Sequence, residues 1–103
     1  MNNDKTVQPL SYYVPTIPEE DDNPNFVLIE LQNKYGLALE GLNKVEKLYL
    51  IMLIASSRCF RESIKKLYRK EIFTIMHRIE GELIGEEQEG LLEALIDGVR
   101  YQK

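Results

Sequence analysis

Residues 48–55 read Leu-Tyr-Leu-Ile-Met-Leu-Ile-Ala, an apolar run that constrains the fold of this 103-residue chain more than any other feature. Successive residues of a helix are turned by about 100°, so eight apolar neighbours cover every side of the axis. Such a helix has to be enclosed by other helices. The run is too short to span a bilayer, which takes about 20 apolar residues. We therefore predict a buried central helix and no membrane segment.

Signals for helix ends lie close to this run. Asn43 followed by Glu46 is typical of a capping box, in which each side chain accepts a backbone hydrogen bond at the helix start. Upstream, Asn23 and Pro24 favour the start of another helix, and Gly36 favours its end. The sequence therefore predicts one helix that ends near Gly36 and a second that begins just after Asn43.

The chain beyond the apolar run is also helical by pattern. Residues 43–80 contain neither proline nor glycine, and apolar residues recur on one side of a helix over residues 58–80. Whether one helix continues through Ser56 and Ser57, or a second helix begins there, is left open by the pattern. A last helix is predicted over residues 86–100, with an apolar stripe and an acidic first turn, as the helix dipole favours.

No strand-like alternation and no internal repeat occurs, so we predict an all-α fold. It is a small three- or four-helix bundle at residues 24–103, preceded by an arm at residues 1–23. The arm holds three of the four prolines and an acidic run, and we expect it to be extended or disordered because proline restricts its own φ and the residue before it. Its Tyr12 and Tyr13 fit a linear recognition segment, although a disordered tail is the equal alternative.

Charge is distributed in three blocks. Residues 1–42 carry two basic and seven acidic side chains, residues 43–78 carry nine and three, and residues 79–103 carry two and seven. The net charges of the blocks are −5, +6 and −5, although that of the whole chain is only −4. Most of the cations are therefore gathered between two acidic segments.

Within the basic block, cations recur at spacings of three and four residues, which places them on one face of a predicted helix over residues 58–70. They are Arg58, Arg61, Lys65 and Arg69, with Lys66 and Lys70 beside them. A solvated face, or one paired with the acidic segments, is our first interpretation. An acidic protein surface is the second and nucleic-acid phosphates the third. A pI of about 5.0 and the lack of a glycine in the preceding turn count against DNA.

Cys59 and His77 are each unique in the sequence and are the natural candidates for nucleophilic catalysis. On one continuous helix they lie roughly 27 Å apart, so a dyad needs the chain to fold back. We expect Cys59 to be a small buried apolar residue and His77 to lie at or near the surface. His77 with Glu80 is a weak metal signal, and no phosphate-binding loop or catalytic motif occurs. We predict no enzyme, no cofactor and no metal site.

These observations predict a non-enzymatic regulatory or adaptor protein that acts through protein–protein interaction as a helical homodimer. In so short a chain, part of the cover for the apolar run is expected from a second subunit; a monomer with an ordinary central helix is the alternative. The expected contacts with an unidentified protein partner are Arg58, Arg61, Lys65, Lys66, Arg69, Tyr12 and Tyr13. A small nucleic-acid-associated regulator that uses the basic helix is the second hypothesis. One cysteine and no apolar N-terminal signal predict a cytoplasmic location.

Overall fold

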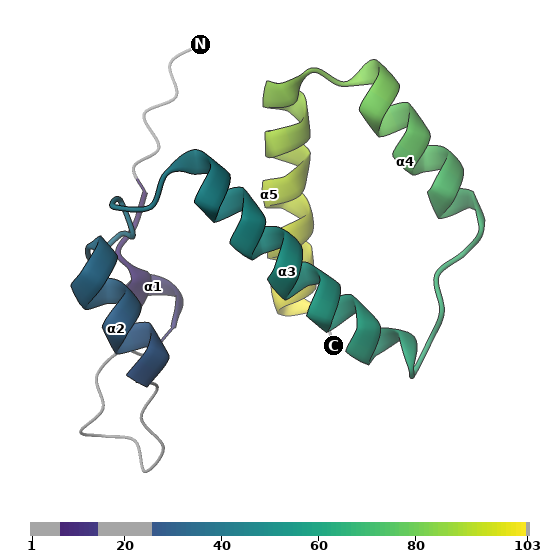
Figure 1. Ribbon diagram of the computed structural model, residues 1–103. Helices are drawn as coiled ribbons and strands as arrows, with labels where there is room; N and C mark the ends of the chain where they lie inside the picture. The colour runs from purple at the N-terminus through teal and green to yellow at the C-terminus, as the bar shows by residue number, and fades with distance from the viewer. Residues whose placement is uncertain (1–6, 15–25, 103) are drawn as a thin grey trace. The chain divides into compact units, whose positions relative to one another are not determined.

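A computed structural model describes residues 7–14 and 26–102, and every regular element in these ranges is a helix. In chain order they are α1 (Leu10–Tyr13), α2 (Phe26–Tyr35), α3 (Lys44–Ser63), α4 (Glu71–Glu82) and α5 (Gly85–Tyr101) (Figure 1). The predicted all-α class is confirmed for the described ranges. The chain divides into two compact units, Met1–Arg58 and Cys59–Lys103, so the division falls inside α3. The predicted boundary between arm and helical domain lies outside the described residues.

α1 is a single helical turn in the segment for which we expect extended or disordered backbone. It fits between two prolines of the sequence. Pro9, just before the turn, has ψ 154°, and Val14, which precedes Pro15, is extended with φ −142° and ψ 150°. Val14 is extended, as expected for a residue that precedes proline. The four residues between Pro9 and Val14 are not restricted in this way and form one helical turn. The N–H of Leu10 donates to the carbonyl of Leu37 at 2.6 Å, which ties this turn to the segment after α2.

Gly36 ends α2, as the sequence predicts. Its φ of +104° lies in the left-handed region, where a Cβ is strained and glycine is favoured. Its N–H donates to the carbonyl of Gln32 at 2.9 Å, and the N–H of Leu39 donates to the Gly36 carbonyl at 2.9 Å. Leu39 also has a positive φ of 57°, which is uncommon for a residue other than glycine. The backbone after α2 therefore turns sharply.

The rest of the connection from α2 to α3, residues 36–43, folds back on the end of α2. The N–H of Gly41 donates to the Tyr35 carbonyl at 2.6 Å. A Cβ on residue 41 would lie 2.8 Å from this carbonyl oxygen, so the close approach requires glycine. Leu42, whose N–H donates to the Leu39 carbonyl at 3.1 Å, is the one buried hydrophobic residue of the described ranges, with 8% exposed.

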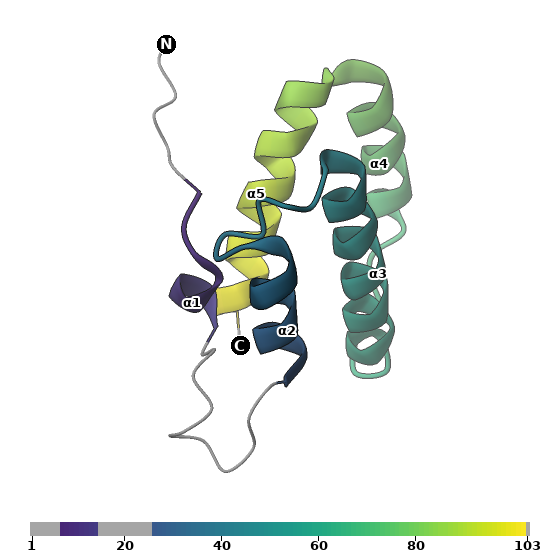
Figure 2. The same cartoon turned by 60° about the vertical axis from the view of Figure 1, so that its left-hand side comes forward.

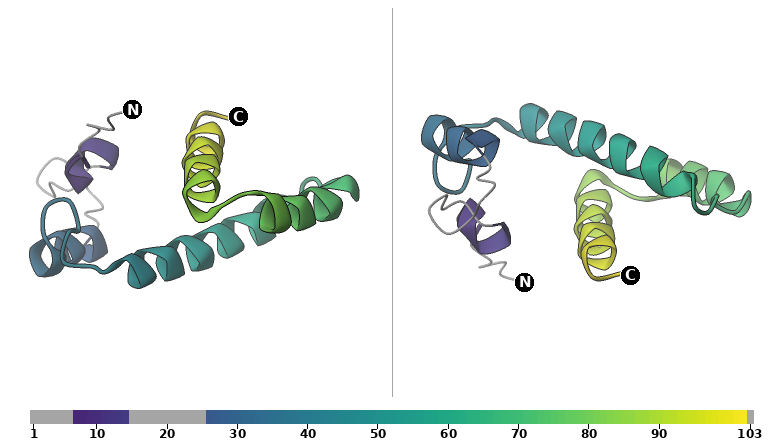
Figure 3. Two further views of the ribbon diagram at one scale, coloured as in Figure 1. Left: turned by 90° about the horizontal axis from the view of Figure 1, so that it is seen from above. Right: turned by 90° about the horizontal axis from the view of Figure 1, so that it is seen from below.

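α3 begins with the predicted capping box. The Asn43 side-chain oxygen accepts the Glu46 N–H at 2.8 Å, and the Glu46 carboxylate accepts the Asn43 N–H at 2.9 Å. The helix then runs through Ser56 and Ser57 without interruption and ends at Ser63. Figure 3 shows α3 as one continuous helix. One helix therefore continues through Ser56 and Ser57, and no second helix begins there.

In the second unit, a two-residue connection joins α4 to α5, and Figure 2 shows the tight turn between them. The N–H of Ile84 donates to the Glu87 carboxylate at 3.0 Å. The Gln88 side-chain amide donates to the carbonyls of Leu83 at 3.0 Å and Ile79 at 3.4 Å. These bonds satisfy backbone groups at the end of one helix and the start of the next.

The last helix matches its predicted bounds to within one residue at each end. Gly81 lies inside α4, although glycine is more typical of helix ends, and Gly85 is the first residue of α5. Within each unit, no two described helices pack against one another along their length. The bundle arrangement therefore stays a prediction.

Candidate interaction surfaces

The apolar run of α3 lies open to solvent in the single chain. None of its eight side chains is buried, and the exposed fraction reaches 62% at Ile54. Most of the stability of a protein helix comes from packing an apolar face against other elements. The described residues of the first unit therefore do not supply the cover that this run needs.

Helical geometry divides the apolar residues of α3 into two sides. The broad side spans about half of the helix surface, by the rotation of 100° per residue. It contains Val45, Leu48, Tyr49, Ile51, Met52, Leu53, Ala55 and Phe60. The narrow side contains only Leu50 and Ile54, one turn apart, with Glu46 towards the N-terminus and Arg58 towards the C-terminus. This second side is not apparent from the apolar run alone, because every residue of the run is apolar; the rotation of 100° per residue distinguishes the two sides.

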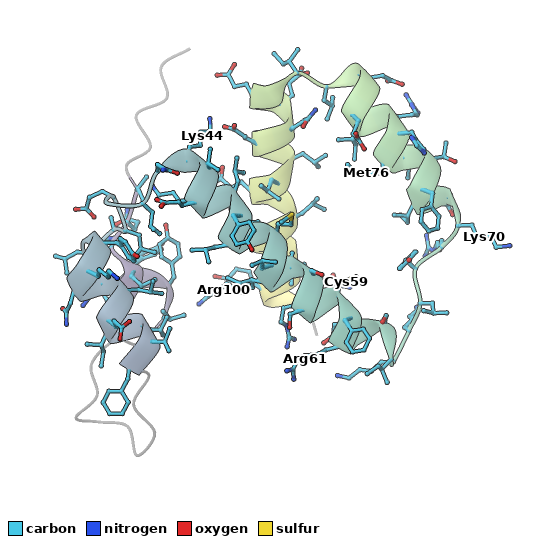
Figure 4. All side chains as sticks on the ribbon, viewed as in Figure 1. Lys44, Cys59, Arg61, Lys70, Met76 and Arg100 are labelled. Atoms are coloured by element: carbon cyan, nitrogen blue, oxygen red, sulfur yellow. The ribbon has the colours of Figure 1, made fainter. Side chains whose placement is uncertain are left out.

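The predicted basic helix over residues 58–70 is wrong. α3 ends at Ser63, and α4 begins only at Glu71. Figure 4 shows Arg61 and Lys70 extending from different elements, Arg61 from the last turn of α3 and Lys70 from the residues before α4. The other predicted cations divide in the same way, with Arg58 on α3 and Lys65, Lys66 and Arg69 in the connection. One helical face carrying all of them does not form.

Like charges explain why the helix ends here. A helix through residues 61–70 would stack cations four residues apart three times, and each such pair costs roughly 0.2–0.5 kcal/mol. The pairs are Arg61 with Lys65, Lys65 with Arg69, and Lys66 with Lys70. Ser63 also binds back along the chain, its hydroxyl donating to the Phe60 carbonyl at 2.8 Å. The spacing that indicates a charged face thus also weakens the helix that would carry it.

Tyr12 and Tyr13 form part of α1, with 70% and 43% of each residue exposed. Their rings meet edge to face, with centroids 5.0 Å apart. These two residues and Arg58 belong to the first unit, whereas the remaining predicted contacts, Arg61, Lys65, Lys66 and Arg69, belong to the second. Neither unit by itself holds all seven residues on one surface.

Cys59 is exposed, which corrects the expectation that it is buried. It lies on the broad side of α3, so it shares the exposure of that side. His77 is exposed on α4, as expected. No group of three or more histidine, cysteine, aspartate or glutamate side chains within the described ranges is suited to hold a metal ion. Among the same residues, no helix has both the length and the apolarity needed to cross a membrane.

An ion pair borders the apolar face of α4. The Nε and Nη2 atoms of Arg78 lie 2.8 and 3.1 Å from the two carboxylate oxygens of Glu82. The Arg78 guanidinium lowers the pKa of Glu82, and Glu82 raises that of Arg78. Together with Ile75, Ile79 and Leu83 the pair lines a shallow hollow. Both side chains are exposed to solvent, so the pair adds little to stability.

Glu40 is a second carboxylate with a lowered pKa, and it lies in the connection at residues 36–43. Hydrogen bonds to its carboxylate from its own N–H and from that of Ala38 are the main causes, the latter at 3.0 Å. They favour the charged form of the group. The carboxylate also lies over Gly36, where it occupies the space that a Cβ would take.

α5 separates an apolar stripe from an acidic one. At 100° per residue, the two stripes fall on opposite sides of the helix. The apolar stripe is Leu91, Leu95 and Val99, and the acidic stripe is Glu86, Glu89, Glu93 and Asp97. Leu95 and Val99 are 56% and 68% exposed. This helix therefore presents a second amphipathic surface.

Comparison with known proteins finds no matching family model, no matching curated protein and no matching solved structure. A function for this chain is therefore inferred from the surfaces described above.

Proposed function

We propose that this chain is a non-enzymatic regulatory or adaptor protein that acts through protein–protein interaction as a helical homodimer. In the dimer, the helices complete a three- or four-helix arrangement whose core is divided between two chains. No catalytic residue, cofactor or metal ion takes part in this function.

The observation that carries the proposal is the exposure of the apolar run on α3. Its side chains point to all sides of the axis; Leu50 has 38% of its surface open and Ile54 62%, and Ile51 is half-buried. Contiguous exposed apolar surface is typical of interaction sites. Each buried CH₂ group contributes about 0.8 kcal/mol, so covering both sides of the run is strongly favourable.

The proposed contacts with the protein partner are the exposed cations near the end of α3 and the two tyrosines of α1. They are Arg58, Arg61, Lys65, Lys66, Arg69, Tyr12 and Tyr13. The cations select an acidic surface and accelerate encounter with it. The tyrosines offer large rigid contact areas with a polar end.

Two measurements test this function. Sedimentation equilibrium of the purified chain is expected to give a dimer. A tagged chain is expected to recover one protein in stoichiometric amount from its source cells, and the double variant Arg61→Glu, Lys65→Glu is expected to lose that protein while remaining dimeric. A folded monomer would contradict the homodimer. Equal recovery of the protein by both chains would contradict the cationic contact.

The nucleic-acid hypothesis has less support after the fold is known, because it relied on a continuous basic helix. Phosphate contacts still remain open to cations in a connecting segment. Retention on heparin or mixed-sequence DNA at physiological salt, abolished by the same double variant, would favour this hypothesis over the protein partner.

A further inference from the structure

We propose that the basic segment, residues 61–70, docks the chain on the surface of an anionic lipid bilayer. The segment comprises the last residues of α3 and the connection to α4, and all of it belongs to the second unit. It lies in the headgroup layer and does not cross the membrane. The inference goes beyond the proposed function and does not depend on the homodimer. It makes the bilayer a competitor for cations of the proposed protein contact.

The basic segment has a high density of positive charge. It contains five cations and one acid, so its net charge is +4 over ten residues. The cations, all of them exposed, are Arg61, Lys65, Lys66, Arg69 and Lys70. The contact of Lys65 with Glu62, at 3.9 Å between exposed side chains, is weak. Clusters of about four to eight Lys and Arg residues are typical of binding to anionic headgroups, and each cation contributes about fivefold in affinity.

Apolar side chains lie among these cations and are more exposed than the apolar run of α3. Ile64 and Leu67 are 76% and 75% exposed, whereas exposure in the run reaches 62% at Ile54. Tyr68 is 54% exposed, and its ring meets that of Phe73 edge to face, with centroids 5.4 Å apart. Tyrosine is favoured at membrane interfaces, where its ring contacts apolar groups while its hydroxyl stays hydrated. The segment therefore offers both charge and apolar surface to one partner.

This combination favours a bilayer over other anionic partners. Nucleic acid offers phosphates to the cations and base faces to the aromatic rings, but no aliphatic interior for Ile64 and Leu67. A protein surface covers such side chains only where its own shape and register match them. Residues 66–69 have no regular secondary structure, so no helix or strand fixes such a register. A bilayer needs none, because the cations stay at the level of the phosphates while the apolar side chains enter the acyl boundary.

Cosedimentation of the full chain with lipid vesicles tests the proposal. Vesicles of equal parts phosphatidylserine and phosphatidylcholine are expected to bind the chain, whereas vesicles of phosphatidylcholine alone are not. Lys65→Gln combined with Lys66→Gln is expected to lower the partition coefficient about 25-fold, because two cations are lost. The control chain, Lys34→Gln combined with Lys47→Gln, loses the same charge outside the segment, and a much smaller change is expected.

Two further variants test whether the apolar side chains enter the bilayer. Leu67→Ser is expected to lower the partition coefficient about tenfold, because it removes a side chain that the acyl boundary buries. Leu37→Ser, at an exposed leucine of the connection at residues 36–43, is the control and is expected to leave it unchanged. The sequence contains no tryptophan, so Tyr68→Trp places a single fluorescent reporter in the segment. Its emission is expected to shift to shorter wavelength on the phosphatidylserine vesicles, whereas that of Phe26→Trp, in α2, is not.

Absence of binding to the phosphatidylserine vesicles would overturn the proposal, and so would binding that Lys65→Gln with Lys66→Gln leaves unchanged. If Leu67→Ser binds as tightly as the natural chain, or if the Tyr68→Trp emission does not shift, the apolar side chains do not enter the bilayer and the proposal fails. Displacement of the chain from the vesicles by mixed-sequence DNA at equal phosphate concentration would assign the segment to nucleic acid instead. The homodimer is tested separately by sedimentation without lipid, so its failure is distinguishable from failure of the docking surface.

Discussion

Two neighbouring regions of the first unit differ sharply in how they are stabilised. The connection at residues 36–43 satisfies its backbone groups within the chain, through bonds such as Gly41 to Tyr35 and Leu42 to Leu39. The apolar run of α3 begins five residues later and leaves all of its side chains unburied. The first region is stabilised by bonds within the first unit, whereas the second is not covered there. Local hydrogen bonding positions the start of α3, and we propose that association covers the apolar run.

The largest effect is expected from a charge at the centre of the broad side. Met52→Glu is predicted to prevent association and to lower the free energy of unfolding by about 3 kcal/mol or more, because a carboxylate cannot be covered by apolar neighbours. Urea unfolding followed by circular dichroism, together with sedimentation, measures both effects. The matched control is Ser57→Glu, on the polar side of the same helix, for which a change within about 0.5 kcal/mol is expected. Equal effects of the two variants would show that the run is not covered.

The next largest effect is expected at the left-handed glycine of the connection. Gly36→Ala is predicted to lower the free energy of unfolding by about 1–2 kcal/mol, since alanine is strained at positive φ and its Cβ would displace the Glu40 carboxylate. The control is the same substitution at Gly98, inside α5, where a Cβ meets no atom within 4 Å. There alanine is expected to stabilise the helix by about 0.8–1.0 kcal/mol. Thermal unfolding shifts of the same sign would contradict this account.

A smaller effect is expected from the capping box that joins the two regions. Asn43→Ala is predicted to cost about 1 kcal/mol, because it removes the acceptor for the Glu46 N–H. Glu46→Gln keeps an acceptor for the Asn43 N–H and is expected to cost much less. Asn33→Ala, inside α2, serves as the control and is expected to stabilise the helix by up to about 0.7 kcal/mol, because alanine has the higher helix propensity. Helix content and urea midpoints of the three variants check this order.

The smallest change in the free energy of unfolding is expected on lowering the pH. The pKa values of Glu40 and Glu82 are lowered in the folded chain, so the unfolded chain binds more protons in the range where these groups titrate. Their contribution is therefore present at neutral pH and is lost as the pH falls below about 4, through the folded pKa values. Carboxyl titration by NMR is expected to show both groups below the ordinary glutamate value. Glu82→Gln should remove its share of the acid dependence, and an unchanged dependence would contradict the role of Arg78.

The sequence predicts those features that depend on near neighbours. Asn43, Glu46 and Gly36 act within four residues, and the structure places each in its predicted role. The positive φ of Leu39 carries no comparable signal in its side chain. The sequence does not predict the end of α3 at Ser63. The segment after it contains no proline or glycine and so is typical of a continuing helix, although it repeats like charges at helical spacing. Residue spacing does not show what covers the apolar run. It also does not show whether the seven predicted contacts share a surface. Both depend on tertiary or quaternary packing.

The most direct test of the account compares amide hydrogen exchange in the two regions at protein concentrations above and below the dissociation constant of the dimer. Protection at residues 48–55 is predicted to rise with dimer formation, because a second copy covers the run. Protection of the Gly41 and Leu42 amides is predicted to stay constant, since their acceptors, the carbonyls of Tyr35 and Leu39, lie in the same chain. Protection of residues 48–55 that is already complete in the monomer would contradict the central claim.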